Sequence, residues 1–221
     1  MASVRRAVML EVAGLGALTA LYLALVPVRP PAVDLGLALL AVVVILMTAG
    51  YTRRRIWGSP DWPAAERVRH SAMHLLTGTS IIVALFAALG AVRVWWTADT
   101  ASAVAAHLLK PTLPVALALF IPWALLQQTL FQFYLLGRMR ALWPAAPPFV
   151  LAAANGVVYG AVHLPAWDVV AVTMIGGTVW SWYYVRDRQL LPIALSHAVL
   201  GTTYFYWVRD QDLIGHWLAG S

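Results

Sequence analysis

The chain has 221 residues, of which 62% are hydrophobic and only 11% are charged, and its mean hydropathy is +0.76. Soluble domains are about 45–50% apolar and about 25% charged, so this composition indicates an integral membrane protein. The sequence contains no cysteine, which excludes disulfides, thiolate nucleophiles and thiolate metal ligands. The formal net charge of +6 does not indicate nucleic-acid binding, because the basic residues lie between apolar runs, as orientation charges do.

Long apolar stretches follow one another along the whole chain. A membrane-spanning helix needs about 20 apolar residues, and about seven stretches approach or reach that length: 7–26, 34–51, 72–92, 112–136, 149–163, 167–185 and 190–208. They predict an all-α polytopic membrane helical bundle with about seven transmembrane helices, forming a single integral membrane domain over 1–221. The first apolar run is too long for a signal peptide and lacks a small-residue cleavage site, so an uncleaved span is expected. A short amphipathic segment is expected around His107.

The distribution of basic residues predicts the orientation of this bundle. Segments on the same side as the N-terminus contain eleven basic residues, among them Arg138 in the expected loop 138–148. Segments on the other side contain four: Arg29, Arg93, Lys110 and Arg209. Because cytoplasmic loops carry an excess of lysine and arginine, we expect a cytoplasmic N-terminus and an outside C-terminus. The expected location is a prokaryotic plasma (inner) membrane. Since no span contains a lysine, a retinal Schiff base is excluded.

The fourth apolar stretch contains three glutamines, Gln127, Gln128 and Gln132. An amide without a partner in hydrocarbon costs several kcal/mol, about 4 or more in the least forgiving solvent, so these side chains must face protein or an internal cavity. On a helix Gln128 and Gln132 share a face, with Gln127 about 100° away. One interpretation is interhelical hydrogen bonding, and the other is a polar site.

His163 and His197 also lie in apolar stretches, and Glu11 is the only carboxylate deep inside one. The histidines are either neutral core residues or general bases. Neither has a cysteine or carboxylate nearby in the sequence, so the sequence predicts no metal site, with a divalent metal as the less favoured option. For Glu11 a structural bond or simple protonation is expected.

Three short motifs follow one another in the second half of the chain. In order they are Gln127-Gln128-x-x-x-Gln132, Tyr159-x-x-x-His163, and His197 with Gly201 four residues later. The second motif is followed by Leu164-Pro165, and Pro192 precedes the third. This arrangement resembles the CAAX-protease and bacteriocin-processing (CPBP) family of intramembrane peptidases, whose motifs are Glu-Glu-x-x-x-Arg, Phe-x-x-x-His and His-x-x-x-Asn. The resemblance covers about residues 112–206.

The resemblance also implies roles for individual residues. In the family a carboxylate and a histidine activate a water, while the second histidine and the asparagine stabilise the oxyanion. It therefore implies catalytic positions at His163, His197, Gln127 and Gln128, and substrate-binding positions at Gln132, Tyr159 and Gly201. This sequence differs from the family motifs at residues that would take part in catalysis. Where the family has a glutamate, Gln127 can position a water but cannot take its proton. Losing a general base removes about 10²–10⁴ in rate, and losing an oxyanion donor about another 10²–10³.

The sequence therefore predicts a CPBP-type, CAAX-protease-like intramembrane endopeptidase homologue that is a hydrolase by resemblance. It would act on or bind membrane-embedded or lipidated peptides or proteins, with hydrolysis impaired or absent, as in a pseudoenzyme. Its expected surroundings are the lipid bilayer and such substrates, with no nucleic acid and no cofactor. Two alternatives stay open. One is an active peptidase in which His163 or His197 is the base, and the other is a non-catalytic membrane scaffold or chaperone subunit.

Overall fold

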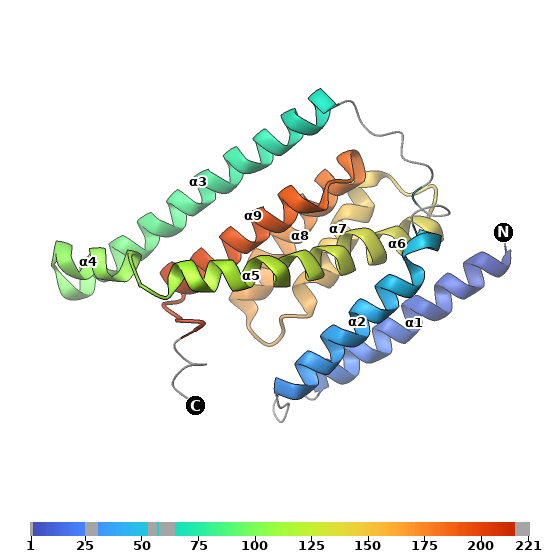
Figure 1. Ribbon diagram of the computed structural model, residues 1–221, viewed down its shortest axis with the longest axis horizontal. Coiled ribbons are helices and arrows are strands. Elements are labelled where there is room, and N and C mark those ends of the chain that lie inside the picture. Colours follow the sequence, from blue (N-terminus) through green and yellow to red (C-terminus); the bar gives the residue numbers. More distant parts are fainter. Residues whose placement is uncertain (1, 25–30, 53–56, 58–64, 215–221) are drawn as a thin grey trace. The chain divides into compact units, whose positions relative to one another are not determined.

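The computed structural model describes residues 2–24, 31–52, 57 and 65–214, and the regular structure among them is helical throughout (Figure 1). This confirms the predicted all-α fold. The chain divides into two compact units, each assembled from two separate stretches of sequence. Unit 1 comprises residues 1–63 and 126–190, and unit 2 comprises residues 64–125 and 191–221.

Unit 1 is built around a helix whose hydrogen-bonding pattern changes along its length. The last residues of α5 (Leu113–Gln128) continue without a break into the π-helical segment η3 (Thr129–Leu135) and then into α6 (Leu136–Leu142). π-Helical segments in α-helices are rare and are frequent at functional sites. Four further helices complete the unit: α1 (Ala2–Ala24), α2 (Pro31–Tyr51), α7 (Pro148–Ala161) and α8 (Trp167–Asp187). Helix α1 contacts α6, whereas α2, α7 and α8 contact η3.

Helices α7 and α8 pack closely because glycines face the neighbouring helix. A Cβ atom added at Gly156 would lie 2.0 Å from Thr178 Oγ1, and one added at Gly160 would lie 2.8 Å from the Val170 carbonyl oxygen. From α8, a Cβ at Gly177 would lie 2.8 Å from Tyr159 Cβ. Small residues let membrane helices approach until their backbones touch. This approach holds the polar side chains of α7 and α8 next to each other.

Unit 2 contains α3 (Ala65–Ala98), α4 (Ala101–Leu108), most of α5, α9 (Leu190–Thr203) from its second residue, and the π-helical η4 (Tyr204–Val208). Helix α3 contacts α4 and η4. A hydrogen bond of 2.7 Å joins Thr79 Oγ1 of α3 to Ser196 Oγ of α9. At the far end of α3, Gly90 leaves room for the η4 backbone, because an added Cβ would lie 2.7 Å from the Trp207 carbonyl oxygen.

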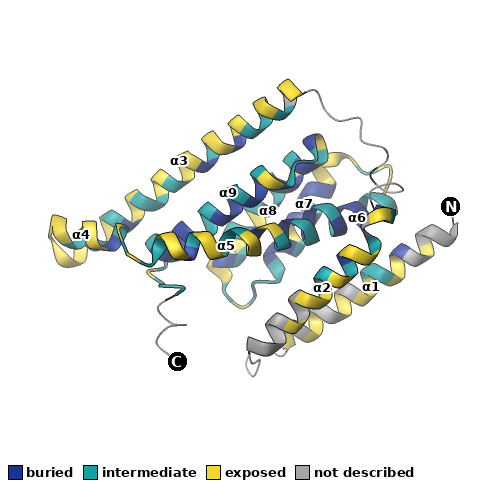
Figure 2. Cartoon of the chain, viewed as in Figure 1, coloured by how far each residue is buried: buried dark blue, intermediate teal, exposed yellow. Residues whose placement is uncertain are grey.

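Large apolar side chains are exposed along most of α3 (Figure 2). Two described helical stretches, Val68–Ala98 and Ala101–Leu142, are long and apolar enough to cross a membrane. Exposed apolar area of this extent is unusual for a soluble monomer and marks contact with lipid or another protein. The number of spans in the bundle, about seven, stays a prediction.

Two predictions about the connections can be compared with the helices. The short segment expected around His107 forms α4, whose N-terminus is capped by Thr100 Oγ1 accepting from the Ala103 N–H at 3.3 Å. The prediction that Arg138 lies in a loop as an orientation charge is wrong. Helix α6 extends to Leu142, and the Arg138 side chain is fully buried inside unit 1.

Candidate functional site

Gln128, Gln132 and Tyr159 lie together in the interior of unit 1. All three are completely buried. Gln132 Nε2 donates to Gln128 Oε1 at 3.0 Å, which places the two amides on one face as their spacing predicts. Gln128 Nε2 donates to the Tyr159 hydroxyl at 3.4 Å and thereby connects the end of α5 to α7.

Two residues that sequence reasoning missed, Asn155 and Ser181, extend this group. Asn155 Nδ2 donates to Gln132 Oε1 at 3.2 Å and to Ser181 Oγ at 2.8 Å. Ser181 Oγ in turn donates to the Gly177 carbonyl at 2.6 Å, so the bonds continue into α8. The available signal was an asparagine inside a predicted span, since intramembrane polar residues are expensive and face the bundle interior. These five residues, Gln128, Gln132, Asn155, Tyr159 and Ser181, form what we call the amide network.

The amide network is electrically neutral and consists of amides and hydroxyls. Each amide nitrogen donates to the next residue, from Asn155 to Gln132, from Gln132 to Gln128, and from Gln128 to Tyr159. An amide oxygen accepts hydrogen bonds but is far too weak a base to remove a proton from water. The network can therefore hold helices together and position a polar ligand group, but its residues supply no general base.

Gln127 lies in unit 1 but outside the amide network. Its side chain is half-buried, whereas Gln128 and Gln132 are completely buried. This difference follows from the rotation of about 100° between consecutive residues of an α-helix. Of the three glutamines, Gln127 is the one that is partly exposed.

His163 lies just after the end of α7 and its ring is half-buried. Its Nδ1 is 2.9 Å from the Tyr159 carbonyl oxygen and 3.3 Å from Thr173 Oγ1. Because a carbonyl oxygen only accepts, Nδ1 carries the proton in this arrangement and Nε2 keeps its lone pair. The Tyr159 and His163 rings are stacked, with centroids 5.9 Å apart. His163 thus has the tautomer that a general base requires.

His197 and Gly201 belong to unit 2 and both contact Phe120 of α5. His197 is buried, and its ring packs edge-on against the Phe120 ring with centroids 5.6 Å apart. A Cβ atom added at Gly201 would lie 2.8 Å from Phe120 Cε1. The Phe120 ring therefore lies beside Gly201 where the side chain of an asparagine would begin. The structure brings Gln128, Gln132 and Tyr159 together in unit 1, and His197 and Gly201 together in unit 2.

Glu11 makes the structural bond expected from the sequence. Its Oε2 accepts from Arg138 Nε at 2.9 Å and from the Tyr134 hydroxyl at 3.0 Å. The Arg138 guanidinium lies 4.0 Å from the centre of the Tyr134 ring and also donates to Thr52 Oγ1. A buried arginine without a carboxylate would carry an uncompensated charge, so this ion pair ties α1 to α6.

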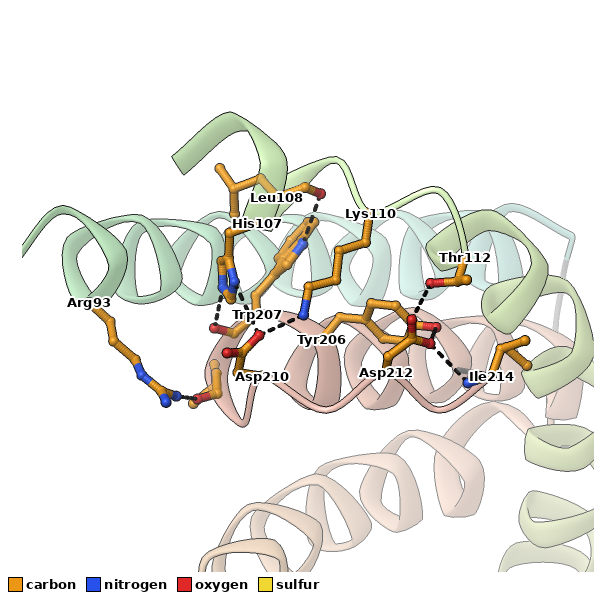
Figure 3. Close-up of polar contacts among 11 residues, drawn as sticks. Arg93, His107, Leu108, Lys110, Thr112, Tyr206, Trp207, Asp210, Asp212 and Ile214 are labelled. Carbon is orange, nitrogen blue, oxygen red and sulfur yellow. Dashed lines mark hydrogen bonds and ion pairs between the residues drawn. The ribbon is translucent and has the colours of Figure 1, made fainter. Parts of the chain in front are cut away.

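A second polar group, the charged clamp, consists of Arg93, His107, Lys110, Asp210 and Asp212 in unit 2 (Figure 3). Lys110 Nζ donates to Asp210 Oδ1 at 2.6 Å, and His107 Nδ1 lies 3.3 Å from the same oxygen. The hydrogen bond from Lys110 is the largest influence holding the pKa of the Asp210 carboxyl below its ordinary value, and the charges of Lys110, His107 and Arg93 add to it. These contacts join the residues around α4 to those that follow η4.

Neighbouring hydrogen bonds reinforce the charged clamp. His107 Nε2 is 3.1 Å from the Trp207 carbonyl oxygen, and Arg93 Nη1 donates to the Val208 carbonyl at 3.0 Å. Asp212 accepts from the Tyr206 hydroxyl at 2.7 Å and from Thr112 Oγ1 at 2.8 Å (Figure 3). Both ring nitrogens of His107 face oxygen acceptors, so this histidine has no nitrogen left for catalysis and serves to hold the segment.

Comparison with known protein families addresses the second half of the chain. Residues 109–203 match the Rce1-like family, described as type II CAAX prenyl endopeptidase Rce1-like. This segment is Rce1-like. The match confirms the resemblance to the CPBP family, because it covers nearly all of the segment 112–206 on which that resemblance rests. The search of the curated proteins and the search of the solved structures each found no match to the chain.

The Rce1-like segment contains every residue of the three motifs, from Gln127 to Gly201. It also contains Asn155 and Ser181 of the amide network, as well as Arg138. Glu11 lies outside it. Among the described residues there is no group of three or more histidine, cysteine or acidic side chains that could hold a metal ion.

Proposed function

We propose that the chain is a CPBP-type intramembrane endopeptidase homologue that binds or acts on membrane-associated peptides or proteins, with hydrolysis impaired. The observation that carries this proposal is the amide network. Gln128 and Gln132 occupy motif positions of a charged family site, yet here they are fully buried in a neutral set of hydrogen bonds. The Rce1-like match supports the peptidase-like architecture.

The ligand that fits this proposal is an embedded or lipidated peptide segment, and no cofactor is needed to bind it. The description of the matching family as a prenyl endopeptidase favours a prenylated peptide. In unit 1 we assign Gln127 and His163 as the residues that contact the peptide or a bound water. His197 of unit 2 is a proposed catalytic position on the motif resemblance alone. Gln127 is chosen over Gln128 because Gln127 is partly exposed.

Two losses combine to reduce hydrolysis. Gln127 can orient a water but cannot accept its proton, which costs about 10²–10⁴ in rate. At the motif position where the family has the oxyanion-binding asparagine, Gly201 has no side-chain donor. The Phe120 ring lies beside it. Losing such a donor costs about another 10²–10³ in rate.

An active peptidase is the second candidate, and the tautomer of His163 favours it. With Nδ1 donating to the Tyr159 carbonyl, Nε2 is free to take a proton from a water positioned by Gln127. A non-catalytic scaffold is the third candidate, supported by the way the amide network links α5, η3, α7 and α8.

The proposed location is a prokaryotic inner membrane with the N-terminus in the cytoplasm. Arg138 no longer counts as a loop charge, since it is buried against Glu11. The remaining basic residues still divide ten against four, which supports the same orientation.

The deciding experiment measures cleavage of membrane-tethered and prenylated peptides by the purified wild type and by a restored variant. The variant Gln127→Glu/Gln128→Glu/Gln132→Arg replaces the amides by the family's motif residues, and its arginine balances one of the new carboxylates. We expect a silent wild type and a variant that cleaves and loses cleavage on adding His163→Ala. Wild-type cleavage that is abolished by His163→Ala would instead establish the active peptidase. If neither protein cleaves or binds the peptides, the non-catalytic scaffold becomes the favoured function.

A further inference from the structure

Two histidines outside every motif, His70 and His74, converge near the start of α3. They are four residues apart, so they lie on the same face of the helix one turn after another. Their Nε2 atoms are 3.1 Å apart, and the ring planes are inclined at 74° with centroids 4.3 Å apart. Both side chains are exposed.

Neither imidazole needs the other ring to satisfy its hydrogen-bonding groups. An exposed imidazole can obtain its hydrogen bonds from water, so bonding to another exposed imidazole gains little. In the structure one Nε2 donates this hydrogen bond to the other. When the shared proton is displaced, both nitrogens can ligate one ion after small side-chain rotations. Histidines at positions i and i+4 of a helix bind zinc in the same way in metalloprotease helices.

The distance agrees with the geometry of a shared metal ion. With metal–nitrogen bonds of about 2.0–2.1 Å, two ligands of a tetrahedral ion lie about 3.3 Å apart and two adjacent ligands of a tetragonal ion about 2.9 Å apart. The observed separation of 3.1 Å lies between these values. Imidazole nitrogen is a preferred donor for zinc and copper.

We propose that His70 and His74 form a surface site for one divalent transition-metal ion, Cu²⁺ or Zn²⁺, at the N-terminal end of α3. The described residues contribute no third histidine or acidic ligand to the pair, so water completes the coordination. Such a site binds reversibly, and by the Irving–Williams order it binds Cu²⁺ more tightly than Zn²⁺. The ion links two successive turns of α3 and stabilises the start of this helix. This inference is independent of the proposed peptidase-like function.

The test is titration of the purified full chain, carrying no histidine tag, with Cu²⁺ in a buffer that does not bind metals. Electron paramagnetic resonance reads the number of nitrogen ligands, and Zn²⁺ serves as the second probe. We expect one Cu²⁺ per chain with two nitrogen ligands in the wild type. Either His70→Gln or His74→Gln should weaken binding at least tenfold. Both residues are exposed, so the variants are expected to fold, and circular dichroism without metal verifies this.

A spacing variant provides the matched control. His74→Gln/Thr77→His keeps the number of histidines and uses another exposed position, but it moves the second histidine to i+7, about 10.5 Å along the helix axis. This variant should bind as weakly as His74→Gln. Absence of Cu²⁺ binding in the wild type overturns the proposal. Equal binding by the wild type and by either the His70→Gln/His74→Gln variant or the spacing variant overturns it as well, since the ion would then bind elsewhere.

In the wild type, Zn²⁺ should also slow amide hydrogen exchange in the first turns of α3, because an ion that binds the folded helix stabilises it by mass action. The spacing variant should show no such protection. Protection of equal size in both proteins would contradict a site formed by the His70–His74 pair.

Discussion

The amide network of unit 1 and the charged clamp of unit 2 solve the same problem, joining helices through polar side chains, with different chemistry. In the amide network every member is fully buried, and the bonds run between amides and hydroxyls. In the charged clamp the side chain of Asp210 is 46% exposed, and Lys110 and His107 meet it with charges or potential charges.

The difference teaches how burial decides which groups a membrane protein can use. Removing a charge from water costs several kcal/mol unless a well-placed partner compensates it, whereas a neutral amide needs only its hydrogen bonds. Where the structure does bury a charge, at Arg138, it provides Glu11 and a tyrosine ring. A neutral glutamine at position 128 thus fits a completely buried position.

The largest effect is expected from breaking the buried ion pair. Glu11→Gln leaves the fully buried Arg138 without its anion and should lower the free energy of unfolding by about 3–5 kcal/mol. Thermal unfolding of the purified protein in detergent measures the loss. Arg138→Met/Glu11→Gln removes both charges and should recover most of it. A double variant as unstable as the single one would show that packing against Tyr134, and not charge, determines the effect.

Restoring one carboxylate in the amide network should also destabilise the protein. In Gln128→Glu the new acid replaces an amide whose described partners, Gln132 and Tyr159, are neutral, and keeping it protonated at neutral pH costs up to about 4 kcal/mol for a glutamate of ordinary pKa. Adding Gln132→Arg supplies the counter-charge and should recover part of the stability. The same unfolding measurement applies. A stable single variant would mean that water reaches this position. The amide network and the charged clamp would then not differ in their access to water.

Removing one member of the amide network gives the next effect. Gln132→Leu leaves Gln128 Oε1 without its donor and Asn155 Nδ2 without one acceptor. Asn155 Nδ2 keeps its bond to Ser181 Oγ, so Gln128 Oε1 is the group that loses its donor, and the loss should be about 1–3 kcal/mol. Gln127→Leu is the matched control, since the same replacement falls outside the network and should change stability by less than 1 kcal/mol, on the order of an ordinary surface substitution. Equal losses in the two variants would refute the network.

The smallest effect is expected in the charged clamp. The pKa of Asp210 is lower in the folded protein than its ordinary value of 3.8, so its contribution is present above that pH and is lost as the pH falls through the folded pKa. Asp210→Asn should therefore destabilise the protein at pH 6–7 by under about 1 kcal/mol, since the pair is exposed. The difference from wild type should shrink in acid. A difference that does not depend on pH would exclude a role for the carboxylate charge.

Several features of the site were accessible from residue types and spacing. The spacing of Gln128 and Gln132 predicts their shared face, and the order of the three motifs indicates the family. Asn155 could have been identified as a polar residue inside an apolar stretch. The partners of Arg138 could not be predicted from the sequence. Glu11 is far away in the sequence, and an arginine at the end of a span is indistinguishable by its position from an orientation charge.

Composition and apolar length by themselves determined the all-helical membrane class, because hydrocarbon permits few polar groups and requires backbone hydrogen bonds to close within each segment. Motif order by itself indicated the family that residues 109–203 match. Only the tertiary structure decided which glutamine is accessible, that Gly201 lies beside Phe120, that Arg138 is buried against Glu11, and that His70 and His74 converge. These properties depend on rotation about a helix axis, on the side-chain rotamers and on contacts between residues distant in the chain, which residue type and local spacing do not specify.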